Sequence, residues 1–479
     1  MSEQHRLLIG GEWVQGAASR PNINPSDTRD VIGEYAQASA RQAAQAVAAA
    51  RSVFGAWCTA SPQVRFDALD FIGSEILARR AELGDLLARE EGKTLAEAVG
   101  EVARAGQIFK FFAAEALRVP GEKLASVRPG LEVEVTREPI GVVVAITPWN
   151  FPIAIPAWKV APALAYGNCV VLKPADLVPG CAWALAEIFS RSGLPAGVFN
   201  LVTGRGSEVG SALLDDPAVD AITFTGSQAT GRRVAQSAVA RLARFQLEMG
   251  GKNPLVVLDD ADLEVALNCA IQGAFYSTGQ RCTASSRLIV TRGIHDRFVA
   301  ALVERTRKLI VGDARTQGTQ IGPVVDESQL AQDLDYVQVG RAEGAQLLCG
   351  GERLERGAPG YYFAPAVLAG ASNAMRSSRE EIFGPVASVI LADGYEDALA
   401  LANDTDFGLS AGICTTSLKH AAHFRRHAQA GMVMVNAPTA GVDYHVPFGG
   451  RKGSSYGPRE QGRAAVEFFT VTKTAYVQP

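Results

Sequence analysis

The chain has 479 residues, of which 47% are hydrophobic and 20% charged, and its formal net charge is −4. A charge this close to neutral gives no broad basic field, so we expect neither a nucleic-acid partner nor attraction to an anionic membrane surface. One core rarely serves a chain of this length, and we therefore expect two or three domains.

Cysteine and histidine usage argues against crosslinks and metal centres. The seven cysteines include no Cys-x-x-Cys pair, and an odd number does not complete a disulfide framework. The six histidines are dispersed, so no metal site is expected. No run approaches the roughly 20 apolar residues of a membrane span, and the first residues lead directly into a strand-like segment at 7–9. These features predict a cytoplasmic protein.

In chain order, the first regular segments have helical spacing. Apolar residues recur at helical intervals over 38–57 and again over 63–91, so the N-terminal part is predicted to be mostly helical. Short apolar runs then alternate with helical patterns, with strands expected at 140–146, 168–172, 198–202 and 221–225 and helices at 179–192 and 207–214. Strands that alternate with helices predict a doubly wound parallel sheet.

A second α/β pattern begins at residues 254–258 and continues to about residue 448, with a helix expected at 263–275 and a strand at 288–290. Two further segments, 131–135 and 470–474, alternate between apolar and polar residues and fit neither half. Alternating strands far apart in sequence, one of them at a chain end, predict an arm that completes its sheet against another element. An ordinary surface hairpin is the alternative.

The residues that carry chemistry begin with Glu248 and Cys282. Each lies in a glycine-bearing stretch, Glu-Met-Gly-Gly-Lys-Asn-Pro and Gly-Gln-Arg-Cys-Thr-Ala. A thiol nucleophile and a carboxylate that activates water are the minimum for forming a covalent acyl-enzyme and then hydrolysing it. Cys282 follows the end of a predicted helix, where backbone N–H groups and the charge of Arg281 are expected to lower the pKa of its thiol.

Two segments upstream supply a polar donor and a phosphate site. The stretch 147–152 places the side-chain amide of Asn150 between a tryptophan and two prolines. The stretch 224–227, Phe-Thr-Gly-Ser, predicts a strand that runs into a glycine turn and a helix N-terminus suited to phosphate, with Ser227 as the N-cap. The glycines at 204–210 depart from the strict dinucleotide fingerprint and carry little weight alone.

These segments, with Glu-Glu-Ile-Phe-Gly-Pro at 380–385, resemble the ordered signature set of the NAD(P)-dependent aldehyde dehydrogenase superfamily. The likeness runs from Ile-Gly-Gly-Glu-Trp at 9–13 to Pro-Phe-Gly-Gly at 447–450. It implies an α/β fold with two doubly wound Rossmann-like domains and a small β oligomerisation arm, which would build a homodimer or homotetramer. The implied boundaries are 1–116 and 138–248 for the cofactor-binding domain, 249–466 for the catalytic domain, and 117–137 with 467–479 for the arm.

The resemblance also implies roles for individual residues. Cys282 would be the nucleophile, Asn150 and the Cys282 backbone N–H the oxyanion hole, and Glu248 the residue that activates water. Members that transfer the acyl group to coenzyme A lack this glutamate, so the expected reaction is hydrolytic. The implied cofactor contacts are Ile146, Thr147, Trp149, Lys173, Asp176, Gly206, Gly210, Thr225, Gly226, Ser227, Gly250, Glu381 and Phe383. A carboxylate at position 176 favours NAD by accepting from the ribose 2′-OH, whereas Lys173 suits a 2′-phosphate, so we lean to NAD with NADP also accepted.

The family fixes the reaction and not the aldehyde. Pocket-facing positions by resemblance are Phe151, Trp158, Tyr276, Arg281, Thr283 and His445. The guanidinium of Arg281 suits a substrate that carries its own carboxylate; alternatively it serves only to lower the pKa of Cys282.

The stretch around Cys282 and the stretch 444–455 together look like those of 2-oxoglutarate semialdehyde (2,5-dioxopentanoate) dehydrogenases. Succinate semialdehyde dehydrogenases typically carry arginine at the positions of Trp158 and Tyr276, so this chain departs from them at both. Succinate semialdehyde and a broad range of aliphatic or aromatic aldehydes remain alternative substrates. A cysteine esterase or hydrolase that uses Cys282 and Glu248 without a cofactor is the alternative class.

Overall fold

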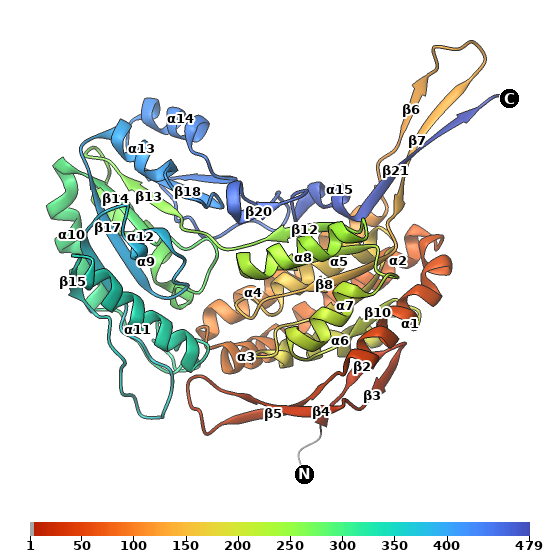
Figure 1. Cartoon of the computed structure of the whole chain (residues 1–479), viewed down its shortest axis with the longest axis horizontal. Coiled ribbons are helices and arrows are strands. Elements are labelled where there is room, and N and C mark those ends of the chain that lie inside the picture. Colours follow the sequence, from red (N-terminus) through yellow and green to blue (C-terminus); the bar gives the residue numbers. More distant parts are fainter. Residues whose placement is uncertain (1–3) are drawn as a thin grey trace.

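A computed structural model describes residues 4–479; residues 1–3, which open the first predicted domain, lie outside the described residues. Two α/β lobes lie side by side, and a slender β arm projects from one of them (Figure 1). The described strands form four sheets, of eight, seven, three and three strands. The two larger sheets position the candidate site.

The first sheet has the strand order β20-β12-β11-β8-β9-β10-β2-β3. Its strands are β2 (Leu7–Ile9), β3 (Glu12–Val14), β8 (Val142–Ile146), β9 (Cys169–Lys173), β10 (Phe199–Leu201), β11 (Ala221–Thr225), β12 (Arg244–Glu248) and β20 (Ser455–Tyr456). The five strands from β8 to β12 are parallel. Strands β8 and β9 are runs of apolar residues because helices cover both faces of a parallel sheet.

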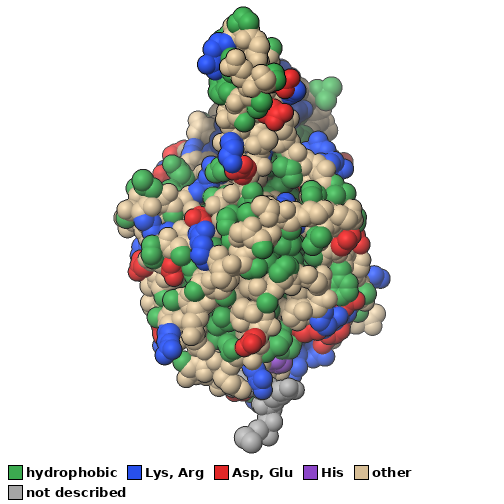
Figure 2. Space-filling model, turned by 90° about the vertical axis from the view of Figure 1, so that its right-hand side faces the viewer, with side chains coloured by type: hydrophobic (Ala, Val, Ile, Leu, Met, Phe, Trp, Pro, Cys, Tyr) green, Lys and Arg blue, Asp and Glu red, His purple; other side chains and the backbone are tan. Residues whose placement is uncertain are grey.

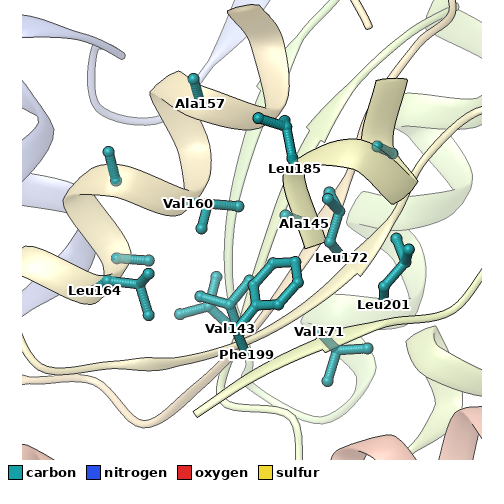
Figure 3. Close-up of a cluster of buried hydrophobic side chains, with 14 of the residues drawn as sticks. Val143, Ala145, Ala157, Val160, Leu164, Val171, Leu172, Leu185, Phe199 and Leu201 are labelled. Atoms are coloured by element: carbon teal, nitrogen blue, oxygen red, sulfur yellow. The ribbon is translucent and has the colours of Figure 1, made fainter. Parts of the chain in front are cut away.

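The core of this lobe lies between the sheet and its helices. Figure 3 shows Val160 and Leu164 of one helix directed at Val143 and Phe199 of the strands. All four side chains are buried, within the largest hydrophobic cluster of the described residues. The helices of this lobe are α1 (Ala40–Cys58), α2 (Pro62–Ala78), α3 (Arg80–Glu91), α4 (Leu95–Ala116), α5 (Ala154–Ala165), α6 (Pro179–Ser190), α7 (Ser211–Asp215) and α8 (Gln228–Ala240).

The chain crosses the first sheet in a way that marks a ligand site. From β8 it adds β9 and β10 on one side and then returns to add β11 and β12 on the other. The strand order therefore reverses between β8 and β11. In doubly wound sheets ligands bind at the carboxyl ends of the strands at such a reversal.

The second sheet has the order β15-β16-β17-β14-β13-β18-β19, and all of its pairs are parallel except β15 with β16. Its strands are β13 (Pro254–Val257), β14 (Arg287–Thr291), β15 (Gln346–Cys349), β16 (Ala366–Ala371), β17 (Val386–Ala392), β18 (Ser410–Cys414) and β19 (Met432–Val435). The helices of this lobe are α9 (Leu263–Ala274), α10 (Arg292–Arg307), α11 (Glu327–Ala342), α12 (Arg376–Arg379), α13 (Tyr395–Asn403) and α14 (Leu418–His427).

Three expectations about local structure need correction. The predicted helical segment 63–91 is two helices, because Arg79 leaves helical geometry between α2 and α3. The segment 207–214 begins as a π-helical turn, η1 (Gly206–Gly210), before α7. The mostly helical N-terminal part holds for 40–116, and the strand-like segment 7–9 is β2, but the strands β1 (Gln4–His5), β3, β4 (Ala18–Ile23) and β5 (Val31–Gln37) were not predicted. These strands lack regular alternation, because most lie at the lobe surface with few inward positions.

The arm is a three-stranded antiparallel sheet of β6 (Glu122–Ala125), β7 (Glu132–Pro139) and β21 (Thr470–Val477). Val135 pairs with Thr474, so the two distant alternating segments lie side by side in one sheet. The arm stands clear of the body, and hydrophobic side chains gather on the face of the body below it (Figure 2). Leu124 and Tyr476 on the arm are exposed.

Within residues 4–479, no helix combines the length and the apolar character that crossing a membrane requires. The same residues contain no group of three or more His, Cys, Asp or Glu side chains placed to hold a metal ion. All seven cysteines are free thiols.

Asn168 ties the start of β8 to the C-terminal segment. Its Oδ1 accepts from the backbone N–H groups of Ile140 and Gly141, and its Nδ2 donates to the carbonyls of Ala163 and Phe469. The side chain is fully buried. Asn168→Ala is expected to lower the free energy of unfolding by at least about 2 kcal/mol, because each buried group left without a partner costs about 1–3 kcal/mol.

The melting temperature of Asn168→Ala, followed by fluorescence at one scan rate, should fall clearly below that of the native chain. Asn268→Ala is the matched control, since that asparagine only accepts from Arg305 at the surface. Equal melting temperatures for the two variants would contradict this role of Asn168.

Candidate active site

Cys282 follows a strained turn. After α9 the chain forms the turn η2 (Tyr276–Gly279), in which Ser277, Thr278 and Gly279 have φ values of 51°, 55° and 67°. Two consecutive non-glycine residues in the left-handed region cost free energy, and such strain persists only where surrounding contacts enforce it. Here Glu97 of α4 provides the contact, since its Oε1 accepts from the Ser277 N–H at 2.8 Å and from the Ser277 hydroxyl at 3.1 Å.

A second contact fixes the backbone of Cys282 itself. Asn253, at the start of β13, donates from Nδ2 to the carbonyls of Cys282 at 2.7 Å and Ala284 at 2.9 Å. Its Oδ1 accepts from the Ser410 N–H at 3.0 Å. The buried amide of Asn253 thus joins the Cys282 loop to two strands of the second sheet.

Asn150 is held against the same loop. Its Nδ2 donates to the carbonyl of Gln280 at 2.9 Å, and its own carbonyl accepts from Lys93 at 2.7 Å. The Lys93 ammonium also pairs with Glu101 at 2.7 Å, with both side chains buried. The second N–H of the Asn150 amide has no acceptor among the described residues. It is therefore available to an oxygen near Cys282.

Glu101 extends this contact to the start of α5. Its Oε1 accepts from the backbone N–H groups of Ile153 and Ala154, both at 3.1 Å. Lys93 lies over the ring of Phe151, 3.8 Å from the centroid. The buried pair from α4 therefore positions the whole segment that carries Asn150.

Glu248 ends β12 as a buried carboxyl group. Its Oε2 accepts from the Ser455 hydroxyl at 2.6 Å. Burial raises the pKa of Glu248 well above its ordinary value, and the nearby carboxylate of Glu460 adds to the rise, while the Ser455 hydrogen bond opposes it. Glu460 is itself paired with the buried ammonium of Lys159.

The prediction that the pKa of the Cys282 thiol is lowered is wrong. Burial raises the pKa of this thiol to about 12, and the carboxylates of Glu381 and Glu248 contribute to the rise. Backbone N–H groups of Cys282 and Thr283 act in the predicted direction but are outweighed. The correction follows from burial, which disfavours a thiolate more strongly than the local donors favour it.

A cavity of about 260 Å³ opens beside Cys282. Phe151, Trp158, Arg281 and Thr283 line it, as the sequence predicts. Tyr276 and His445 are not among the described residues that line it. Tyr276 instead packs against the core of the second lobe, and the ring of His445 lies 5.4 Å from that of Tyr444.

The guanidinium of Arg281 is only partly engaged. Its Nη2 donates to the carbonyl of Gln272, whereas its buried Nε has no acceptor among residues 4–479. Burial lowers the pKa of this guanidinium, and the carboxylate of Glu97 opposes that change. Arg281 therefore keeps hydrogen-bonding capacity next to Cys282.

The carboxyl ends of β8, β9 and β11 lie next to the strand-order reversal, where doubly wound sheets have a crevice for a ligand. The hydroxyls of Thr147 and Thr225 are buried there without a partner among the described residues. Lys173 donates only to the carbonyl of its neighbour Pro174, at 3.0 Å, and burial lowers the pKa of its ammonium. Unpaired hydroxyls and an ammonium at this position fit the ribose and phosphate groups of a dinucleotide.

Other predicted cofactor residues lie around this crevice. Ser227 caps α8 by accepting from the Thr230 N–H, and the Gly226 N–H donates to the carbonyl of Glu248 at 3.1 Å. Ile146 ends β8, while Gly206 and Gly210 bound the π-helical turn η1. Asp176 is not free, since its carboxylate forms an ion pair with Arg20 at 2.7 Å.

Glu381 approaches the chain where glycines leave room. Its Oε1 accepts from the Gly251 N–H at 2.7 Å, and a Cβ added at Gly250 would meet its carboxylate oxygen at 1.9 Å. Burial raises the pKa of Glu381 to about 7. Phe383, with φ 64°, places its ring edge-on to Trp149, 5.3 Å between centroids.

The sequence profile of the aldehyde dehydrogenase family matches residues 13–475. The chain belongs to the aldehyde dehydrogenase family. The predicted family and fold class are thereby confirmed, and the protein is an NAD(P)-dependent oxidoreductase of small aldehydes.

Curated relatives of this aldehyde dehydrogenase match along 95–100% of its length. It is 45% identical to the α-ketoglutaric semialdehyde dehydrogenase of Bacillus subtilis, over 100% of this chain and 99% of the relative. Identity to the α-ketoglutarate semialdehyde dehydrogenase of Haloferax volcanii is 41%, over 99% of each chain. Identity to the betaine aldehyde dehydrogenase of Cereibacter sphaeroides is 42%, over 95% of this chain and 93% of that one.

A solved structure has the same fold. The betaine aldehyde dehydrogenase of Staphylococcus aureus in complex with NAD+ superimposes with a TM-score of 0.96 at 34% identity, covering 99% of this chain and 95% of that chain. The aldehyde dehydrogenase fold and the use of a nicotinamide dinucleotide by this family agree with the crevice described above.

Several residues of the site were not foreseen from the sequence. Four charged side chains of α4 and of the residues just before it line the cavity: Lys93, Glu97, Glu101 and Arg104. Glu97, Glu101 and Arg104 lie at positions i, i+4 and i+7 of one helix and share a face. A charged stripe of this spacing in an otherwise apolar helix was the available signal.

The raised pKa of Cys282 gives a measurable expectation. Below its pKa, the thiolate fraction and hence the alkylation rate rise about tenfold for each pH unit. Modification of Cys282 by iodoacetamide, followed by mass spectrometry of its peptide in the cofactor-free protein, should therefore keep rising from pH 7 to pH 10.

Free cysteine in the same buffers is the control, since its rate levels off above its ordinary pKa of about 8.5. A plateau for Cys282 at or below that pH would contradict the effect of burial.

Proposed function

We propose that this aldehyde dehydrogenase oxidises 2-oxoglutarate semialdehyde (2,5-dioxopentanoate) to 2-oxoglutarate and releases the acid by hydrolysis. The observation that supports this choice of substrate is the position of Arg281. This cation lies next to Cys282 in the cavity wall, and its Nε has no acceptor among the described residues. A cationic wall favours an aldehyde with its own carboxylate and opposes a quaternary ammonium substrate such as betaine aldehyde. The names of the two semialdehyde dehydrogenases that match this chain support the same choice.

In this proposal the Cys282 thiol gives up its proton to water, and the thiolate attacks the aldehyde carbon, which breaks the C=O π bond and forms a thiohemiacetal. The free N–H of the Asn150 amide and the backbone N–H of Cys282 donate to the oxygen as it gains negative charge. Lys93 and Glu101 contribute by holding Asn150, and Glu97 by holding the turn before Cys282. When bound, the nicotinamide cofactor supplies the acceptor for the hydride that leaves this carbon.

Hydrolysis of the resulting thioester on Cys282 is assigned to Glu248. In its carboxylate form it takes a proton from a water molecule, whose oxygen then attacks the thioester carbon and displaces the thiolate. The Ser455 hydroxyl holds this carboxyl group in place. The product is a carboxylic acid, and coenzyme A is not required.

The proposed cofactor contacts are those that the sequence predicts at the crevice. Thr147 and Thr225 offer unpaired hydroxyls there, Lys173 offers an ammonium that donates only to the Pro174 carbonyl, and Ser227 lies at a helix N-terminus. We propose NAD as the preferred cofactor with NADP accepted. The ion pair between Asp176 and Arg20 supports acceptance of both, because it places a cation beside the carboxylate that would repel a 2′-phosphate.

We also retain the predicted division of the chain as a proposal: 1–116 with 138–248 for the cofactor, 249–466 for catalysis, and 117–137 with 467–479 as an oligomerisation arm. The exposed apolar residues of the arm support a homodimer or homotetramer, in which they would be covered. The cytoplasmic location likewise stays a prediction.

Initial rates of NADH and NADPH formation test the substrate. The native enzyme should have a higher kcat/KM for 2-oxoglutarate semialdehyde than for succinate semialdehyde, and both should exceed pentanal and betaine aldehyde. In Arg281→Ala the preference for carboxylated aldehydes should fall by roughly 1.5–3 kcal/mol, the strength of hydrogen bonds to a charged group. Equal kcat/KM values for charged and uncharged aldehydes in the native enzyme would refute the substrate.

Glu460→Gln tests the assignment of Glu248. Removing the neighbouring carboxylate, and leaving Lys159 as an unpaired cation, lowers the pKa of Glu248. Hydrolysis of the acyl group on Cys282 needs the ionised Glu248, so the acid limb of its pH profile should move to lower pH. The substrate for this test is 4-nitrophenyl acetate, an ester that acylates Cys282 without a cofactor. Its turnover is measured from pH 5 to pH 9.

Glu467→Gln, which removes an exposed carboxylate near the chain end, is the matched control and should keep the native limb. Melting temperatures should accompany the profiles, because a buried ion pair broken on one side costs about 3–5 kcal/mol. If the acid limb of the pH profile stays at the same pH in a folded Glu460→Gln variant, ionisation of Glu248 does not limit hydrolysis.

A further inference from the structure

One face of α4 forms a wall of the cavity beside Cys282. Glu97, Gly100, Glu101 and Arg104 lie at i, i+3, i+4 and i+7, and all four line the cavity. A Cβ added at Gly100 would meet nothing within 4 Å, so the wall is open between Glu97 and Arg104. Three charged side chains therefore border a space that has room for a substrate chain.

The two acidic side chains of this wall are already satisfied. Glu97 accepts from the Ser277 N–H and from the hydroxyls of Ser277 and Thr94. Glu101 accepts from Lys93 and from two backbone N–H groups at the start of α5. Their negative charges are thus directed at protein groups.

Arg104 differs from both. It is half-buried and lines the cavity, yet it makes no hydrogen bond and no ion pair with any residue from 4 to 479. A guanidinium offers five N–H donors, and a partly buried one is normally paired. Its donors are therefore available to a ligand in the cavity.

Arg281, the other guanidinium of the cavity, is near enough that the charge of Arg104 lowers its pKa. The charge of Arg281 is partly balanced by Glu97, and one of its N–H groups is engaged by the Gln272 carbonyl. Two like charges on one cavity repel, and an anion between them removes that repulsion. The uncompensated positive charge of the cavity accordingly lies at Arg104.

We propose that Arg104 binds the carboxylate of the aldehyde substrate and, with Arg281, selects carboxylated aldehydes over uncharged and cationic ones. The inference rests on the proposed function and adds a residue of α4 that determines specificity. Arg281 adjoins the nucleophile in sequence, whereas Arg104 is presented from a separate helix across the open wall at Gly100. The pair can therefore receive a carboxylate at the far end of a chain whose aldehyde lies at Cys282.

Arg104→Ala tests the proposal through ratios of kcat/KM. The ratio for 2-oxoglutarate semialdehyde over pentanal should fall about 10–100-fold, as expected for the loss of hydrogen bonds to a charged group. The ratio for betaine aldehyde over pentanal should rise, since a repelling cation has been removed. Arg104→Lys should give intermediate ratios, because the ammonium keeps the charge but not the two-pronged geometry.

Lys110→Ala is the matched control. Lys110 lies on the same helix and also carries a positive charge, but it pairs with Asp70 at 2.6 Å and does not line the cavity. Its ratios should equal those of the native enzyme. A fall like that of Arg104→Ala would mean that any loss of positive charge from α4 has the effect, which overturns the proposal.

The remaining outcomes separate this inference from the proposed function. If the native enzyme prefers the carboxylated aldehyde and Arg104→Ala keeps that preference, the inference fails and the proposed function stands. If Arg104→Ala slows all three aldehydes equally, Arg104 has a structural role only, and the inference again fails. A native enzyme without preference overturns both.

Discussion

The passage of the chain from the first sheet to the second, at residues 249–253, fixes the geometry on which the rest of the site depends. Glu248 ends β12, and only five residues separate it from the start of β13. Within them Gly251 donates to Glu381, and Asn253 holds the carbonyl of Cys282. A Cβ added at Gly251 would meet that carbonyl at 2.4 Å, so only glycine lets the two segments approach this closely.

Burial decides the electrostatics of this centre. Glu248 is fully buried, Glu381 and Cys282 are partly buried, and burial is the largest cause of the raised pKa of each. Groups held neutral in the absence of ligands can change protonation when a charged cofactor or substrate enters. Shifted pKa values concentrated at one place are typical of active sites, because the fold there holds groups in states that water would not favour. The neighbouring ion pairs Lys93–Glu101 and Lys159–Glu460 keep the surrounding charges balanced.

Much of this could be predicted from the sequence, for reasons that particular residues make plain. The strands β8, β9 and β11, which end at or just before Thr147, Lys173 and Thr225, are mostly apolar runs with sharp ends, so the apolar pattern located them, and the local motifs gave the family. Strand β12, which ends in Glu248, is not an apolar run and was not predicted. The sign of the Cys282 pKa shift could not be predicted, because it depends on tertiary burial. The contribution of the charged face of α4 to the cavity was not predicted, because packing between the lobes decides which residues contact that face. The N-terminal strands other than the one at 7–9 lack regular alternation, so periodicity could not locate them.

The C-terminal strand β21 has a consequence for when the site can form. The carbonyls of Phe468 and Thr470 accept from Arg244 at the start of β12, the strand that ends in Glu248. A segment 224–226 residues further along the chain therefore anchors the strand that carries a central carboxyl group. A nascent chain can fold its earlier helices during synthesis, but β12 gains this anchor only after residues 468–470 have emerged. The strand that ends in Glu248 is thus anchored only after more than 220 further residues have been synthesised.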